Sequence, residues 1–130
     1  MARHSSKHPT ELELEILKVL WQQGESTVRE VRLTLAGFRD LAHTSVMTMM
    51  TIMTDKGYLK RVKKGNKYLY KACVTEKGTS RGMLEDIVQR AFQGSTMAAV
   101  VNLLEVGDVD SAELTELSKL IKKKKGEVTA

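Results

Sequence analysis

The sequence of 130 residues contains a single cysteine and lacks a long apolar run. Because one thiol cannot form an internal disulfide, Cys73 is typical of a protein of the reducing cytoplasm. No stretch approaches the roughly 18 consecutive apolar residues that a membrane span requires. The N-terminal segment MARHSSKHPT has basic residues but no apolar segment behind them, so we expect no signal peptide. These absences predict a cytoplasmic protein and exclude a disulfide-rich secreted one.

Motifs that carry catalysis are also missing. The chain has no Gly-rich phosphate loop, no paired carboxylates in an apolar context, and no Ser or Cys nucleophile with a His partner. His4 and His8 have an i, i+4 spacing that would suit a metal ion, but no third ligand accompanies them. We therefore expect no enzyme, no cofactor and no metal site.

Positive charge is concentrated in the first part of the chain. Residues 1–73 hold 13 Lys or Arg against 7 Asp or Glu, whereas residues 74–130 hold 8 against 9. Residues 56–71 contain seven basic residues and no acidic one. A basic segment joined to a nearly neutral one favours a polyanion-binding module attached to a second part. The alternative is that the lysine run is an ordinary solvated surface.

Capping motifs and glycines place three helices in the first sixty residues. Capping boxes over residues 10–13 and 27–30 predict helices that end at Gly24 and Gly37. A third helix is expected over about residues 43–56, ending at Gly57, with Asp40 or Thr44 as its cap.

Two strand-like segments follow, YLKRVKK and KYLYKAC, around Gly65-Asn66. A Gly-Asn pair between such segments predicts a β-hairpin, for which we expect inward side chains at Tyr58, Val62, Tyr68 and Tyr70. Three helices and then a basic hairpin is the order of a winged helix-turn-helix domain.

The third helix has two unlike faces. Helical periodicity places Val46, Met49, Met50 and Met53 on one side, as expected of a core, with a sulfur-rich ligand pocket as the alternative. The opposite side carries threonines, which form helix poorly and make short hydrogen-bonding side chains. With a basic hairpin beside it, this side is predicted to contact DNA rather than to be plain surface. The predicted DNA-binding residues are His43, Thr44, Ser45, Met47, Thr48 and Thr51 on the helix, and Lys60, Arg61, Lys63, Lys64 and Lys67 on the hairpin.

The rest of the chain predicts three short amphipathic helices, over about residues 79–93, 95–105 and 111–124, with Asp110 capping the last. Such a thin layer has little interior of its own, so we expect it to bury its apolar faces against a second copy. The predicted dimerisation residues are Leu84, Ile87, Val88, Phe92, Met97, Val100, Val101, Leu104, Leu114, Leu117, Leu120 and Ile121. The fold class is thus mainly α with a small β-hairpin: a winged-helix DNA-binding domain (1–73), a helical dimerisation domain (74–124) and a flexible tail (125–130).

The segments PTELELEILKVLW, TVREV, HTSVMTMMTIMTDKGYLKRVKKGNKYLY and VVNLLE resemble the penicillinase and methicillin-resistance repressors of the BlaI/MecI type. The resemblance covers residues 9 to about 123. Ser45 stands where that family usually has Thr. The copper-responsive branch carries paired Cys-x-Cys motifs, and this chain has only Cys73, expected to be a small buried side chain rather than a redox sensor.

The resemblance implies a homodimeric repressor on a palindromic operator in double-stranded DNA, released through proteolysis triggered by a membrane-bound metalloprotease sensor. It implies a cleavage site between Asn102 and Leu103, where the family usually has Phe after the Asn. Two alternatives are a winged-helix regulator that answers a small ligand in a pocket between the two parts, and a protein-interaction module that binds no DNA.

Overall fold

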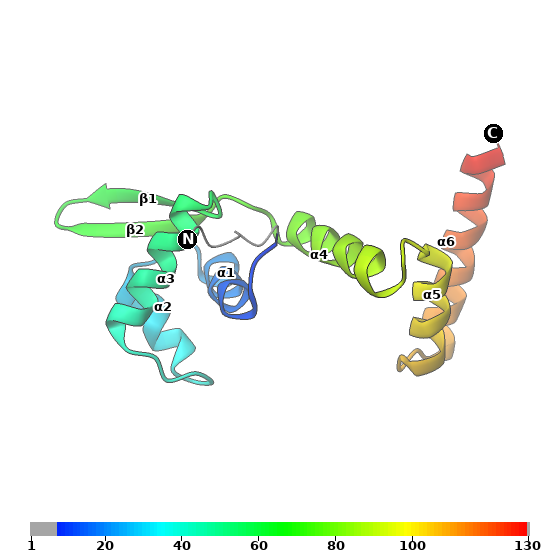
Figure 1. Cartoon of the computed structure of the whole chain (residues 1–130), viewed down its shortest axis with the longest axis horizontal. Helices are drawn as coiled ribbons and strands as arrows, with labels where there is room; N and C mark the ends of the chain where they lie inside the picture. The colour runs from blue at the N-terminus through cyan, green and yellow to red at the C-terminus, as the bar shows by residue number, and fades with distance from the viewer. Residues whose placement is uncertain (1–7, 130) are drawn as a thin grey trace. The chain divides into compact units, whose positions relative to one another are not determined.

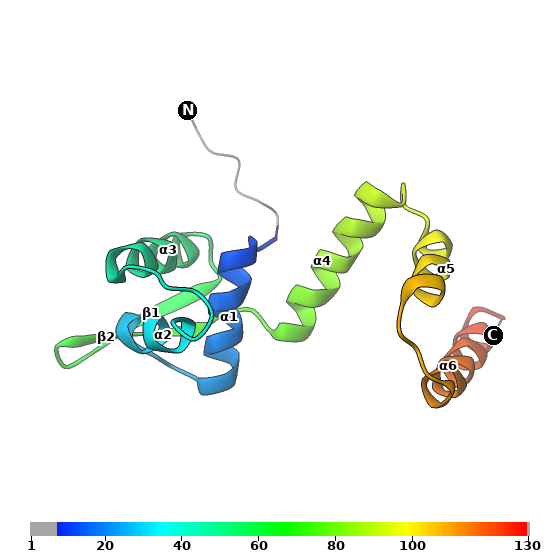
Figure 2. The same ribbon diagram turned by 90° about the horizontal axis from the view of Figure 1, so that it is seen from below.

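The computed structural model describes residues 8–129 and divides the chain into two compact units, the second beginning at Asp86. The first unit contains α1 (Glu11–Gln23), α2 (Val28–Leu35), α3 (His43–Asp55), β1 (Leu59–Lys64) and β2 (Lys67–Ala72). This order of helices followed by a two-stranded antiparallel hairpin is the winged helix predicted from the sequence. Figures 1 and 2 show the hairpin, called the wing below, projecting from the three helices.

Three further helices complete the chain: α4 (Glu76–Ala91), α5 (Thr96–Val106) and α6 (Ser111–Thr129). The expected domain boundary lay at residue 73, but the compact units divide between Glu85 and Asp86, within α4. Within the first unit, the indole Nε1–H of Trp21 donates a hydrogen bond to the Val74 carbonyl at 2.9 Å, and Val74 packs against the core just before α4. In the described part of the chain, no helix is long and apolar enough to cross a membrane.

The capping boxes begin α1 and α2 as predicted. Thr10 N–H donates to Glu13 Oε1 at 2.8 Å while Glu13 N–H donates to Thr10 Oγ1 at 3.2 Å. The corresponding pair at Thr27 and Glu30 spans 2.9 and 3.1 Å. Hydrogen bonding from the Thr27 backbone N–H, and after it from the Thr27 side chain, lowers the pKa of the Glu30 carboxyl because it stabilises the charged form.

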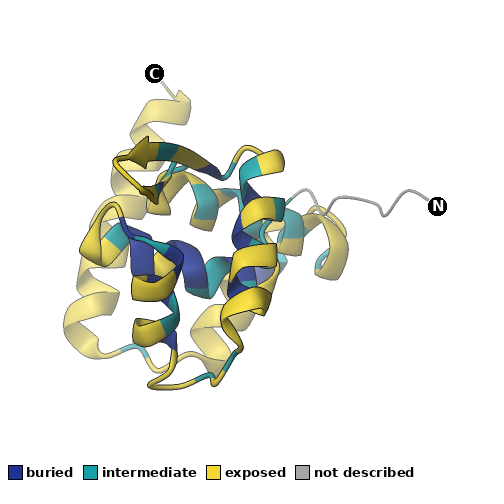
Figure 3. Cartoon of the chain, turned by 90° about the vertical axis from the view of Figure 1, so that its left-hand side faces the viewer, coloured by how far each residue is buried: buried dark blue, intermediate teal, exposed yellow. Residues whose placement is uncertain are grey.

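The core of the first unit lies among the three helices and the base of the wing (Figure 3). The third helix contributes Val46, Met50 and Met53, which are fully buried, while Met49 is partly buried against them. This confirms the predicted core face of α3. In α4, α5 and α6, by contrast, Ala99 is the one hydrophobic side chain classed as buried within the described residues.

Several boundaries and orientations differ from those predicted. Helix α3 begins after Ala42, not after an Asp40 or Thr44 cap, and a methyl group accepts no hydrogen bond. Helix α6 continues through the segment expected to be a flexible tail and ends at Thr129. Helix α4 ends before Gly94, whose φ of +81° lies in the left-handed region that interrupts a helix.

The wing register corrects two expected side-chain orientations. Gly65-Asn66 forms the turn, and β1 pairs with β2 so that Lys63 faces Tyr68 and Arg61 faces Tyr70. Tyr68 therefore shares a face with Arg61 and the buried Tyr70, but it lies near the tip, beyond the core, where it is 44% exposed. Val62 pairs with Leu69 on the opposite face, so the expectation that it points inward with Tyr70 was wrong. Leu59 is the buried side chain at the base of the wing, and Tyr58 is only partly buried.

Cys73 is exposed, contrary to the expectation of a small buried side chain. It follows Ala72, which packs against the core at the end of β2, so strand alternation turns the thiol outward. Its backbone N–H donates to the Tyr58 carbonyl at 2.8 Å and closes the base of the wing.

Candidate nucleic-acid interface

The six predicted contact residues of α3 are all exposed in the structure, as are the five predicted basic residues of the wing. Short polar side chains thus cover the solvent side of α3. Thr51 Oγ1 donates to the Met47 carbonyl at 2.9 Å, which leaves the lone pairs of this hydroxyl for an incoming donor. Met47, 44% exposed, is the large apolar side chain among them.

The turn between α1 and α2 holds the wing in place beside α3. Ser26, buried in the turn between α1 and α2, exchanges two backbone hydrogen bonds with Tyr70 of 3.1 and 2.8 Å. At the wing tip, Lys64 Nζ forms an ion pair with Glu25 of the same turn at 3.1 Å. The wing is therefore anchored at its middle and near its tip, and Lys64 is partly neutralised.

A groove of about 530 Å³ lies between the start of α2, the exposed face of α3 and the wing. Its lining comprises Thr27, Val28, Arg29, His43, Met47, Thr51, Arg61, Asn66, Lys67, Tyr68 and Tyr70. The groove brings together three of the predicted helix residues and two of the predicted wing residues. Thr44, Ser45, Thr48, Lys60, Lys63 and Lys64 do not line it and lie elsewhere on the exposed surface.

Sequence reasoning missed five polar or aromatic residues of this groove: Thr27, Arg29, Asn66, Tyr68 and the buried Tyr70. Arg29 lies in the first turn of α2, where the helix dipole and free backbone N–H groups favour an anion. That position lies inside the capping box over residues 27–30, and the capping box was the available signal. Tyr68 was assigned to the core because it alternates with Tyr70, but the tip of the wing extends beyond the core.

Cations are stacked on the exposed tyrosine of the wing. The Arg61 guanidinium lies 4.4 Å from the centre of the Tyr68 ring, and Lys63 Nζ lies 5.9 Å from it. The shorter contact is a cation–π interaction, worth about 0.5–1 kcal/mol at an exposed site. It restrains Arg61 on the groove side of the wing, so its charge is directed toward the same space as α3.

The predicted dimerisation residues are mostly exposed in the single chain. Val88 and Phe92 are half-buried, and the remaining ten are exposed. Asn102 and Leu103, at the predicted cleavage site, are also exposed, and Asn102 Nδ2 donates to the Ala98 carbonyl at 2.9 Å within α5. The structure thus leaves a large apolar surface on the second unit.

No three His, Cys, Asp or Glu side chains gather as metal ligands anywhere in residues 8–129. His4, half of the i, i+4 histidine pair, lies outside the described residues. His8 lies near Cys73 in a separate pocket formed with Tyr58 and the start of α4.

Comparison with known proteins points to the same repressor family that the sequence resembles. A family model described as penicillinase repressor matches residues 9–123. The chain is similar to the penicillinase repressor of Bacillus licheniformis, with 24% identity over 116 residues covering 89% of this chain and 91% of that protein. It is similar to the transcriptional regulator BlaI of Mycobacterium tuberculosis (strain CDC 1551 / Oshkosh), with 30% identity covering 79% and 76% of the two chains.

Among solved structures, the chain is similar to the monomeric form of Bacillus licheniformis BlaI in complex with the blaP half-operator. The two share 25% sequence identity, with a TM-score of 0.49, and the match covers 56% of this chain and 89% of that one.

Proposed function

The chain belongs to the penicillinase repressor family of DNA-binding transcriptional repressors, and we propose that it acts as a homodimer on a palindromic operator. In this proposal α3 enters the major groove and the wing lies over the neighbouring backbone. The observation that carries it is the shared groove, in which the polar face of α3 meets the cationic side of the wing. Partners of the protein are therefore double-stranded DNA and a second copy of itself.

Each part of the interface has its own role. Thr44, Thr48 and Thr51 bond phosphate oxygens or base edges, and their methyl groups pack on thymine methyls. Arg29 of α2 and Arg61 of the wing both line the groove, so a DNA strand lying there meets positive charge from two elements. The wing lysines contact phosphates and supply affinity that depends on salt, not sequence choice.

The exposed apolar surface of α4, α5 and α6 supports the dimer. A monomeric protein rarely leaves so many large apolar side chains in water, because their burial is the main favourable term in association. Two α3 helices related by a two-fold axis require half-sites about 34–36 Å apart or a multiple of that spacing.

Repression ends, in this proposal, when a protease cuts between Asn102 and Leu103 in response to a membrane metalloprotease sensor. A protease needs extended backbone, whereas this bond lies inside helix α5. Cleavage therefore requires local opening of α5, a short helix with few buried side chains of its own. Leu103, in place of the Phe usual in the family, keeps an apolar residue after the cut.

The DNA-binding proposal is tested by titrating the protein with duplex DNA at several salt concentrations. Each phosphate contact contributes about 0.9 to the slope of log affinity against log salt. Replacing Lys60, Lys63 and Lys67 with Ala should reduce that slope by about three and weaken binding to all sequences. We leave Lys64 out because Glu25 already pairs with it.

A matched control removes three exposed lysines from α6, Lys122, Lys123 and Lys125, and changes the net charge equally. Its slope should stay near that of the unchanged protein. A protein that bound no duplex at low salt would contradict the proposal and favour a protein-interaction module. Operator release by a small molecule, without cleavage, would favour the ligand-responsive regulator.

A further inference from the structure

Helix α3 is weakly specified by its own residues. Ala42 provides no side-chain cap, and the threonines on the exposed face form helix poorly. Its core face is formed mainly by methionines, which are flexible and adapt to many packing arrangements. Apolar packing therefore keeps α3 on the core without determining its rotation and shift closely.

At the C-terminal end of α3, a buried ion pair connects the helix to α1. Lys56 Nζ lies 2.9 Å from Glu13 Oε2, and the Glu13 side chain is only 1% exposed. The other oxygen of the same carboxylate accepts the Thr10 N–H, which fixes the orientation of the carboxylate. A charge buried in this way is costly unless it stays paired, so Lys56 is held at one place.

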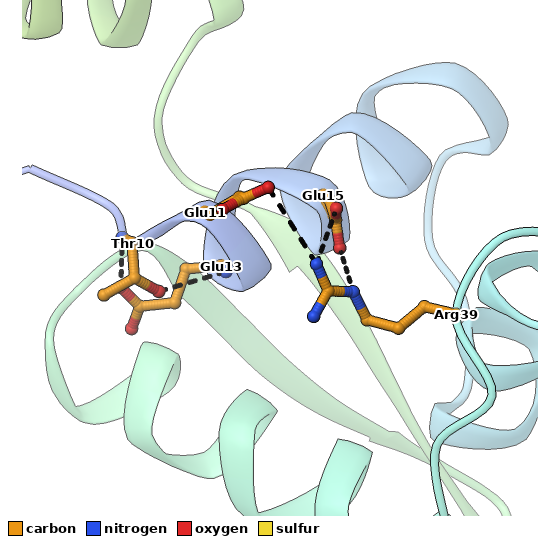
Figure 4. Close-up of polar contacts among 5 residues, drawn as sticks. All are labelled: Thr10, Glu11, Glu13, Glu15 and Arg39. Carbon is orange, nitrogen blue, oxygen red and sulfur yellow. Dashed lines mark hydrogen bonds and ion pairs between the residues drawn. The ribbon is translucent and has the colours of Figure 1, made fainter.

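Before the N-terminal end of α3, a second ion pair connects the preceding turn to the same helix, α1. Arg39 Nε lies 2.8 Å from Glu15 Oε2, and Arg39 Nη2 donates to Glu15 Oε1 at 3.2 Å (Figure 4). Glu11 is 4.0 Å from the same guanidinium and its side chain is 87% exposed, so it contributes little. The guanidinium thus meets both carboxylate oxygens of Glu15, one through a hydrogen bond and one through an ion-pair contact, whereas a lysine would present a single point charge.

We infer that Glu13 and Glu15 are positioning residues for DNA recognition: through Lys56 and Arg39 they hold α3 at both ends against α1. This inference rests on the proposed function. Phosphate contacts by long lysines tolerate a small shift of α3, but short threonine side chains do not. Loss of either ion pair therefore lowers sequence-specific binding and leaves non-specific binding nearly unchanged.

The test uses Glu13→Gln and Glu15→Gln in the full chain. Glutamine keeps the size of the side chain, and at position 13 it still accepts the Thr10 N–H. Glu11→Gln is the matched control, since it makes the same substitution on the same helix at an exposed position. Ile16→Val, which removes a buried methylene from α1, is the control for lost stability.

Affinity is measured for two duplexes of equal length and composition. One is selected by the unchanged protein from duplexes with a randomised central segment, and the other is its shuffled version. The ratio of the two affinities should fall about fivefold in Glu13→Gln and in Glu15→Gln, equivalent to one net hydrogen bond of about 1 kcal/mol. The shuffled duplex should bind all variants alike, and Glu11→Gln and Ile16→Val should keep the original ratio.

The inference is wrong if both variants are folded by circular dichroism and keep the ratio, or if Ile16→Val lowers it equally. Should Glu13→Gln unfold, Glu15→Gln decides the matter alone, because its pair is partly exposed. If the unchanged protein selects no duplex, the proposed function fails instead.

Discussion

A chain that ends at Asn102 should lose the dimer while it keeps the winged helix. The cut removes Leu104, Leu114, Leu117 and Leu120, which are 46, 45, 37 and 60% exposed in the single chain. About half of each side chain thus remains to be buried by a second copy. Since full burial of a leucine contributes about 1.5–3 kcal/mol, the eight leucines of a dimer contribute about 6–12 kcal/mol.

A loss of that size lowers the dimerisation constant at least about 10⁴-fold. Two separate winged helices then bind half-sites independently, each with half the phosphate contacts, and dissociate at physiological salt. Sedimentation of the fragment and titration of a palindromic duplex measure both effects. A control chain that ends at Lys124 keeps all four leucines and should stay dimeric. A fragment 1–102 that remained dimeric and bound would refute release by cleavage.

Three further outcomes are expected. Replacing Thr44 and Thr48 with Ala should weaken specific binding and leave the melting temperature unchanged or slightly higher, because both are exposed and Ala forms helix better; unchanged affinity for the selected duplex would show that the contact face is elsewhere. Replacing Val101 and Leu117 with Asp should give a protein that sediments as a monomer, binds the operator weakly and keeps the winged helix, because a charged side chain is costly to bury. A stable dimer would exclude these two helix faces from the interface. Because the pKa of Glu30 is lowered, its contribution to stability is complete above the ordinary value of 4.5 and is lost as pH falls through the lowered pKa. The melting temperature of Glu30→Gln should therefore fall less between neutral and acid pH than that of the unchanged protein. An equal fall in both proteins would contradict this assignment.

Local signals explain why the winged helix was predictable. A capping box involves residues three apart, and the core face of α3 follows from helical periodicity alone. The basic wing and the threonine face likewise depend on neighbours in the chain, so the candidate contact residues were found before their arrangement was known. Where the local signal was poor, the details were wrong: Ala42 rather than Asp40 or Thr44 caps α3, and α6 continues along the lysine-rich segment that was expected to be a flexible tail.

The orientation of the wing depended on one further fact, the strand register. Pairing across Gly65-Asn66 puts Tyr68 and the buried Tyr70 on one face of the wing and Val62 on the other, and Tyr68 lies beyond the core near the tip. Hydrophobic character alone assigned all of them to the interior. The register instead makes Tyr68 a platform for Arg61 at the groove.

The sequence by itself determined the elements, their order and the charged and polar faces they carry, because these follow from interactions within a few residues. Only the tertiary structure decided which of these faces meet. Lys56 and Glu13 are 43 residues apart, and Arg39 and Glu15 are 24 apart. Such pairs form only after the core has packed the helices together, so neither the groove nor the ion pairs beside α3 could be found from local pattern.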